Sequence, residues 1–418
     1  MRQAALPAGE FSAPGTDWGE NFWHFDLFLA AITVFVAPMQ YFRVSFAYIT
    51  LADVFALLTV LTMMASGRLP LHPFGRGAII WYSSVFMLAF GLLFSSVVNG
   101  ELLDGALVSG QYCFSLLIMP LVILQRPRDE AVLLIKVFVA SMVVIMLHGA
   151  WYMEYAPDDL RFVTRNGRLA SLIERENDAG ALAAMSIVFT LWLLFIREIR
   201  LWIAVPVLIP LGYGLLLTGS NTGFFLTLIG ATALVVLSFR VRLILGLLVV
   251  GLVGVFVLYS WGHLFLPEIF LRRVFGALET GDVGRAGTFS DRMFLIHEAL
   301  RLTRDTIFVG MGADQYRMVS AHGAPVHNTY LLLLAEGGLI SLLGYFGLFV
   351  TVLFLCWPVM MNHQTRWYAV LTITITVMLA LVQNGLAHLY ARFWLVPWFL
   401  VIGVCISVAP DNPENQDF

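Results

Sequence analysis

Apolar runs about as long as a membrane-crossing helix repeat along nearly the whole of this 418-residue chain. A helix needs roughly 20 apolar residues to cross about 30 Å of hydrocarbon. The chain is 60% hydrophobic and only 12% charged, and its mean hydropathy is +0.85, outside the range of ordinary soluble domains. The sequence therefore predicts an all-α polytopic membrane protein that forms a single integral membrane domain over residues 1–418.

The apolar runs predict about twelve transmembrane helices, and we expect no cleavable signal peptide before the first of them, because residues 1–23 are polar and acidic. The predicted spans are 24–42, 45–66, 77–97, 105–124, 131–153, 180–196, 201–218, 223–239, 243–262, 327–357, 368–387 and 393–409.

The distribution of arginine predicts the orientation of these spans, because cytoplasmic loops are enriched in positive charge. With the N-terminus in the cytoplasm, ten arginines fall on the cytoplasmic side, and only Arg43 and Arg392 fall in short outer loops. Both termini are then cytoplasmic, and the two long loops, 154–179 and 263–326, both lie on the outer side.

The first outer loop, residues 154–179, is unusually rich in positive charge for its side of the membrane. It carries Arg161, Arg165, Arg168 and Arg175, with several acidic residues among them. Two interpretations remain open: the arginines bind an anionic ligand, or they pair with the neighbouring carboxylates, which contributes little to stability at an exposed surface.

The second outer loop, residues 263–326, has more local organisation. Arg272 and Arg273 lie near its start. Ser290 is a good N-cap for a helix over about 291–304. The GMG at 310–312 is no nucleotide fingerprint, because it lacks the preceding strand and the third glycine; we expect it to form a tight turn back to the membrane.

Ionisable residues inside apolar spans are rare and usually functional. Glu336 lies nine residues after His327, about 180° around a helix at 100° per residue. His327 therefore faces the outer mouth, whereas Glu336 points toward the middle of the membrane, in a packing or a chemical role. Asp53, in the second span, is expected to hold helices together.

The predicted orientation gathers many polar side chains on the outer side, where a reaction at the membrane surface could use them. Besides His327, they are Asn221, Gln383, Asn384, His388, Tyr390 and Arg392.

Three motifs between about 218 and 343 resemble the O-antigen ligase and polysaccharide polymerase family of bacterial inner-membrane glycosyltransferases. They are TGSNTG, DRMFLIHEALRLTRDTIFVGMGADQYR and HNTYLLLLAEGGLISL. The resemblance implies that a glycan is transferred from undecaprenyl diphosphate to an acceptor sugar at the periplasmic face, with no metal and no other cofactor.

The resemblance also implies roles for individual residues. His327 matches the family's essential histidine, and Arg292 matches its loop arginine, so both are catalytic candidates. Where the family usually has an arginine in its short TGSR turn, this chain has Asn221, so another arginine replaces that charge or the phosphate is bound less tightly. The substrate-binding candidates are Asn221, Asn328, Arg165, Arg168, Arg272, Arg273 and Arg392.

The expected partners are the undecaprenyl-diphosphate-linked donor, membrane lipids, and either lipid A core or a lipid-linked glycan as acceptor, but no nucleic acid. A ligase acting on lipid A core is the first interpretation, and an O-antigen or exopolysaccharide polymerase is the second. A lipid-linked oligosaccharide flippase and a non-catalytic scaffold are alternatives from other classes; for a flippase, two related halves would be expected.

Overall fold

The computed structural model describes residues 18–44, 49–271 and 289–410, and these residues are mostly helical. The described strands form one short antiparallel ribbon, β1 (Arg43–Val44) with β2 (Ile49–Thr50), in which Arg43 is opposite Thr50. Arg272 and Arg273 lie outside the described residues.

The first half of the chain is folded mainly as helices. They are α1 (Trp18–Val36), η1 (Gln40–Phe42), α2 (Leu51–Ala65), η2 (Gly75–Gly77), α3 (Ala78–Asn99), α4 (Leu102–Cys113), the π-helix η3 (Phe114–Ile118), α5 (Met119–Ile123), α6 (Arg128–Tyr155), η4 (Ser171–Ile173) and α7 (Glu176–Phe195).

The second half continues the bundle and adds short helices at one end of it. They are α8 (Leu201–Thr218), α9 (Asn221–Val236), α10 (Val241–Phe265), α11 (Glu268–Phe270), α13 (Phe289–Leu302), α14 (Tyr316–Val319), α15 (Thr329–Met361), α16 (Arg366–Val382), η7 (Gln383–Gly385) and α17 (Arg392–Ser407).

Among the described residues, seven helices are long and apolar enough to cross a membrane. Shorter apolar helices occupy the positions of the remaining predicted spans: Phe25–Val36, Leu51–Ala65, Asn221–Val236, Val241–Gly254 and Arg392–Ser407. The structure thus supports a polytopic helical membrane protein, while the count of twelve crossings stays a prediction.

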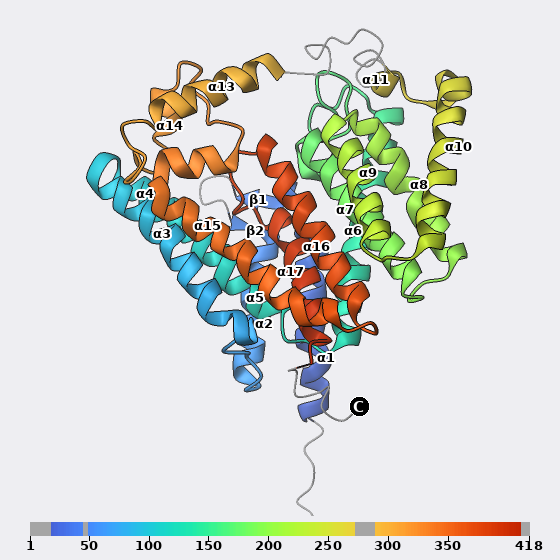
Figure 1. The fold of residues 1–418 in the computed structure, drawn as a ribbon, viewed down its shortest axis with the longest axis horizontal. Helices are drawn as coiled ribbons and strands as arrows, with labels where there is room; N and C mark the ends of the chain where they lie inside the picture. Colours follow the sequence, from blue (N-terminus) through green and yellow to red (C-terminus); the bar gives the residue numbers. More distant parts are fainter. Residues whose placement is uncertain (1–17, 45–48, 272–288, 411–418) are drawn as a thin grey trace, which may run out of the picture.

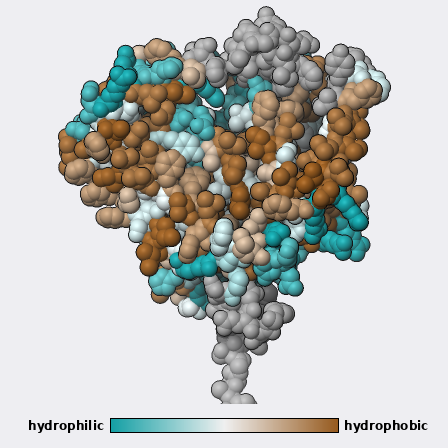
Figure 2. Space-filling view, viewed as in Figure 1, coloured by the Kyte–Doolittle hydropathy of each residue, from teal (hydrophilic) through white to brown (hydrophobic). Residues whose placement is uncertain are grey.

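The helices run between two polar ends of the molecule. In Figure 1, α13 and α14 lie at one end of the bundle, and α1 begins toward the opposite end. Figure 2 shows a broad belt of hydrophobic side chains around the middle of the same face, with hydrophilic residues above and below it. This distribution is typical of a protein embedded in a bilayer. We call the end that carries α13 and α14 the outer end.

Glycines allow α3 and α15 to pack closely against each other. A Cβ added to Gly91 would lie 2.8 Å from the backbone nitrogen of Ser341, and one added to Gly344 would lie 2.5 Å from that of Leu88. Small residues that let helix backbones approach are common where membrane helices pack.

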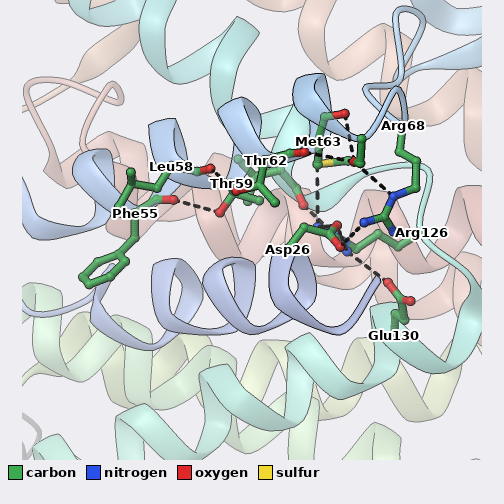
Figure 3. Close-up of polar contacts among 11 residues, drawn as sticks. Asp26, Phe55, Leu58, Thr59, Thr62, Met63, Arg68, Arg126 and Glu130 are labelled. Carbon is green, nitrogen blue, oxygen red and sulfur yellow. Dashed lines mark hydrogen bonds and ion pairs between the residues drawn. The ribbon is translucent and has the colours of Figure 1, made fainter. Parts of the chain in front are cut away.

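Figure 3 shows a buried charge network that links α1 to the segment after α2 and to the segment before α6. Asp26 is 2% exposed and pairs with Arg68 at 2.9 Å and with Arg126 at 3.4 Å. Arg126 also pairs with Glu130, in the first turn of α6, at 3.0 Å. The intramembrane carboxylate of Asp26 therefore has partners for both of its oxygens.

Candidate functional site

The start of α15 places His327 at the outer end of the bundle. The side chain of Asn328 accepts a hydrogen bond from Leu331 N at 3.0 Å and caps the helix. Its amide nitrogen donates to Asn384 at 3.2 Å. His327 therefore lies just before the helix, rather than on it, and Asn328 is engaged in capping and in joining α15 to the segment after α16.

The packing of α13 brings Arg292 near His327, on which its charge acts, but Arg292 is not among the residues that line the cavity beside His327. Leu295 and Ala299 on α13 pack with Val326, the residue before His327. The Arg292 Nη1 atom lies 3.3 Å from the position that a Cβ on Gly385 would occupy. α13 already contains Ser290, so the expected helix start after Ser290 was wrong by at least two residues.

Helix α15 is broken at Gly338, and backbone hydrogen bonds with the segment that contains the GMG motif hold the two parts of the helix in place. Gly338 has φ +68°, and the amide of the next residue, Leu339, donates to the carbonyl of Ile307 at 2.8 Å instead of continuing the helix. The freed carbonyl of Glu336 accepts from Gly312 N at 3.0 Å. A Cβ on Gly338 would overlap the carbonyl of Phe308. The positive φ values of the GMG glycines agree with the tight turn expected there.

Glu336 is buried where the break in α15 meets the second outer loop, and it helps to hold the two together. Its side chain is 3% exposed and accepts a hydrogen bond from Tyr316 N at 3.3 Å. Because the carboxylate faces the backbone of the second outer loop, the geometry favours a packing role over a chemical one.

His327 lines a cavity of about 290 Å³, and the other lining residues come from segments that are far apart in the sequence. The polar lining comes from the β1–β2 ribbon, the end of the first outer loop, the start of α7 and the loop before α17. These residues are Gln40, Arg43, Thr50, Glu174, Arg175, Asp178, His388, Tyr390 and Arg392.

Two of the cavity's arginines are neutralised by carboxylates. Arg392 is 4% exposed, and its Nε donates to Asp53 at 2.7 Å. Asp53 also accepts from the backbone of Thr50 at 2.8 Å, which caps α2. Arg43 pairs with Glu174 at 2.9 Å. The cavity can therefore use these charges less freely than their number suggests.

Arg175 and Asp178 differ from these pairs. Arg175 is exposed, and Asp178 is 5% exposed. Their charges interact, but over the described part of the chain neither side chain forms a hydrogen bond or an ion pair. One cation and one carboxylate thus face the cavity with their bonding capacity unused.

The environment of His327 keeps its imidazole neutral at neutral pH. Burial, with the positive charges of Arg292 and Arg175, lowers the pKa of His327 below its usual range. Its Nδ1 atom is buried and has no hydrogen-bond partner among the described residues. Burial and Arg175 also lower the pKa of His388, whose ring stacks on Tyr390 at 5.1 Å. A neutral imidazole can accept a proton, as a general base must.

Arg168 is buried and occupied by the protein itself. Its Nε donates to the carbonyl of Thr218 at 2.7 Å, and Nη2 donates to Asn177 at 2.7 Å. It also pairs with Glu176. Arg168 therefore holds the TGSNTG turn against the start of α7, and the geometry favours this internal pairing over ligand binding.

The other candidates have different positions. Asn221 is the first residue of α9 and does not line the cavity, although the preceding Ser220 packs on Gly180 of α7. Arg165 is exposed in the first outer loop, away from the cavity lining.

Sequence reasoning did not select Arg43 and Asp178 as site residues, and it named Arg175 only among the four loop arginines that could bind an anion. Arg175 and Asp178 belong to the charged run EREND at the start of an apolar span, and Arg43 is one of two arginines in short outer loops. All three are charged residues directly beside the outer end of a helix. This feature could have selected them, but it would also have selected many other residues.

Comparison with known proteins supports the resemblance carried by the motifs. No curated protein matches the chain significantly. Residues 206–346, which include the TGSNTG turn, Arg292 and His327, match the family model described as O-antigen ligase. This match, over about a third of the chain and within a helical membrane fold, supports the similarity to the O-antigen ligase and polysaccharide polymerase family.

Proposed function

We propose that the protein is an O-antigen ligase-like glycosyltransferase of the bacterial inner membrane. It moves a glycan from undecaprenyl diphosphate to an acceptor sugar, lipid A core first and a lipid-linked glycan second, in the cavity around His327 at the periplasmic face. The observation that carries the proposal is a partly buried histidine that lines a cavity at the outer end of a membrane bundle, where the charges of two arginines act on it.

The chemistry requires a proton acceptor and a cationic site. The acceptor hydroxyl forms a bond to the anomeric carbon, while the bond from that carbon to the diphosphate breaks and its electron pair leaves with the diphosphate. His327 takes the hydroxyl proton. Negative charge grows on the departing diphosphate, and fixed arginines stabilise it by charge-assisted hydrogen bonds without a metal.

Arg292 and Arg175 are the cations that fit this second role. Both act on the charge state of His327, and neither forms an ion pair among the described residues. Arg175 lies at the start of α7, whose Gly180 contacts the TGSNTG turn at Ser220. It therefore supplies positive charge beside the turn in which Asn221 stands where the family usually has arginine.

Histidine replacement tests the proton-acceptor role. We expect His327→Ala to lower glycan transfer about 100-fold or more, the usual contribution of a general base. Transfer is measured in membranes that contain the lipid-linked donor. His297→Ala, at an exposed position of α13, is the matched control and should transfer normally. Transfer near the wild-type rate in His327→Ala would remove this residue from the mechanism.

Arginine replacement tests the diphosphate site separately. Arg292→Ala should weaken binding of undecaprenyl diphosphate about 10- to 100-fold, as expected for lost hydrogen bonds between charged groups. Arg304→Ala, an exposed arginine just after α13, is the matched control. Normal affinity in Arg292→Ala would show that Arg292 does not bind the diphosphate.

A transporter is less well supported, although α15 is broken as some transporter helices are. In transporters the broken segments line the substrate site, whereas the freed backbone groups at Gly338 are bonded to residues 307–312. Cysteine labelling that changes on both membrane faces with substrate would favour transport instead.

A further inference from the structure

Asp178 is an unusual carboxylate for a membrane protein. It is 5% exposed, lines the cavity and forms no hydrogen bond or ion pair with any described residue. Burying a carboxylate without partners is unfavourable, and the usual outcome is a charged or hydrogen-bonded partner. A side chain held in this state at a substrate cavity has unused capacity for a ligand.

The position of Asp178 favours a ligand that donates hydrogen bonds. Asp178 lies in the first turn of α7, a 20-residue helix whose positive end stabilises a carboxylate. The charge of Arg175, three residues earlier, also acts on it. Burial opposes ionisation of Asp178, whereas the helix end and Arg175 favour it. In either form the carboxyl oxygens accept hydrogen bonds, and sugar hydroxyls are the donors that a glycan brings to this cavity.

Neighbouring carboxylates do not share this capacity. Glu174 pairs with Arg43 at 2.9 Å, and Asp53 is held by Arg392 at 2.7 Å and by the backbone of Thr50. Of the two carboxylates that line the cavity in the described residues, Asp178 is therefore the one left for substrate.

We infer that Asp178 binds a hydroxyl of the sugar attached to the diphosphate, and that it thereby helps to select the donor. The inference rests on the proposed function, because it takes the diphosphate to lie at Arg175. Arg175 is the N-cap of α7 and Asp178 is the third residue of that helix; both line the same cavity, and their charges interact. A diphosphate at Arg175 therefore puts its first sugar next to Asp178.

Asp178 assists the reaction without exchanging a proton. Positive charge develops on the donor ring as its bond to the diphosphate breaks, and hydrogen bonds to ring hydroxyls strengthen at that stage. The proton still passes from the acceptor hydroxyl to His327. Asp178 is thus a donor-specificity residue that contacts substrate, distinct from the proton acceptor.

The test separates sugar binding from diphosphate binding. The full-length protein in nanodiscs is titrated with undecaprenyl diphosphate, which carries no sugar, and glycan transfer is measured in donor-containing membranes. Asp178→Asn should lower transfer about 10- to 100-fold, as for one lost charged hydrogen bond, and leave undecaprenyl diphosphate affinity within about twofold. Arg175→Gln should lower both. Asp159→Asn, in a surface ion pair with Arg161, is the matched control.

Thermal unfolding excludes a merely structural role. Because Asp178→Asn removes a buried charge without partners, the unliganded variant should unfold at the same temperature as the wild type or higher. A lower unfolding temperature, normal transfer, or an equal loss of undecaprenyl diphosphate affinity would each overturn the inference. If the wild type does not bind undecaprenyl diphosphate, the proposed function fails, and the inference fails with it.

Discussion

We expect Arg168 to stabilise the fold around the site and not to bind substrate. It is 3% exposed and donates to Thr218 O at 2.7 Å, and its other bonds reach the first turn of α7. Through these bonds it joins the first outer loop, the TGSNTG turn and the helix that carries Arg175 and Asp178. We expect loss of Arg168 to destabilise the fold itself.

The size of the effect follows from the bonds that are lost. Removing one partner of a buried ion pair costs about 3–5 kcal/mol, so Arg168→Ala should lower the free energy of unfolding by about that amount. Arg168→Lys keeps the positive charge, but one ammonium cannot reproduce the planar fork of the guanidinium. It should still cost about 2–3 kcal/mol, since several hydrogen bonds are lost.

Thermal unfolding in detergent measures these changes. Arg165→Ala is the matched control, because Arg165 is exposed in the same loop, and it should change stability by less than about 0.5 kcal/mol. The reasoning would be refuted if Arg168→Ala unfolded like the wild type but bound undecaprenyl diphosphate weakly, because Arg168 would then serve the ligand and not the fold.

Three further changes test the fold and the site. Gly338→Ala should lower stability by about 3 kcal/mol in thermal unfolding, because it combines a positive φ with a steric overlap; unchanged stability would contradict the locked break. Activity that needs neutral His327 should persist below pH 6.5 and fall only at lower pH, because the pKa of His327 is lowered. Arg292→Gln should raise that pKa, so the acidic limb of the pH profile of kcat/KM should move to higher pH. An acidic limb that does not move would contradict the role of Arg292. Arg392→Gln should cost about 3–5 kcal/mol by unpairing Asp53, and adding Asp53→Asn should recover part of the loss; no recovery would mean that the pair is not the source.

Much of the fold was readable from local sequence because its cause is local. A run of apolar residues must satisfy its backbone within a helix, so the predicted spans coincide with helices that the structure describes. The opening of α15 at HNTY was predicted nearly in place, since Asn328 caps the helix with its own side chain.

The break in α15 was only partly readable. Gly337 and Gly338 are small residues of the kind that let a neighbouring helix approach closely, and Gly91 of α3 lies against Gly337. At Gly338, however, the neighbour is the 307–312 segment, which replaces the missing helical hydrogen bonds. The glycines of the 307–312 segment and those at 337–338 are separated in the sequence, so their contact is seen only in the folded structure.

By itself the sequence indicated a helical membrane protein that resembles a glycan-transferring family, and it placed His327 and Arg292 in the motifs that carry this resemblance. Only the tertiary structure decided which other charges accompany them. The sequence alone does not distinguish Arg168 from Arg175, because both are arginines of one charged loop. In the structure Arg168 is buried against the TGSNTG turn, whereas Arg175 faces the cavity. The reason is physical: a charge is available to a ligand only if the packed protein leaves it without a partner, and packing joins segments that are far apart in the chain.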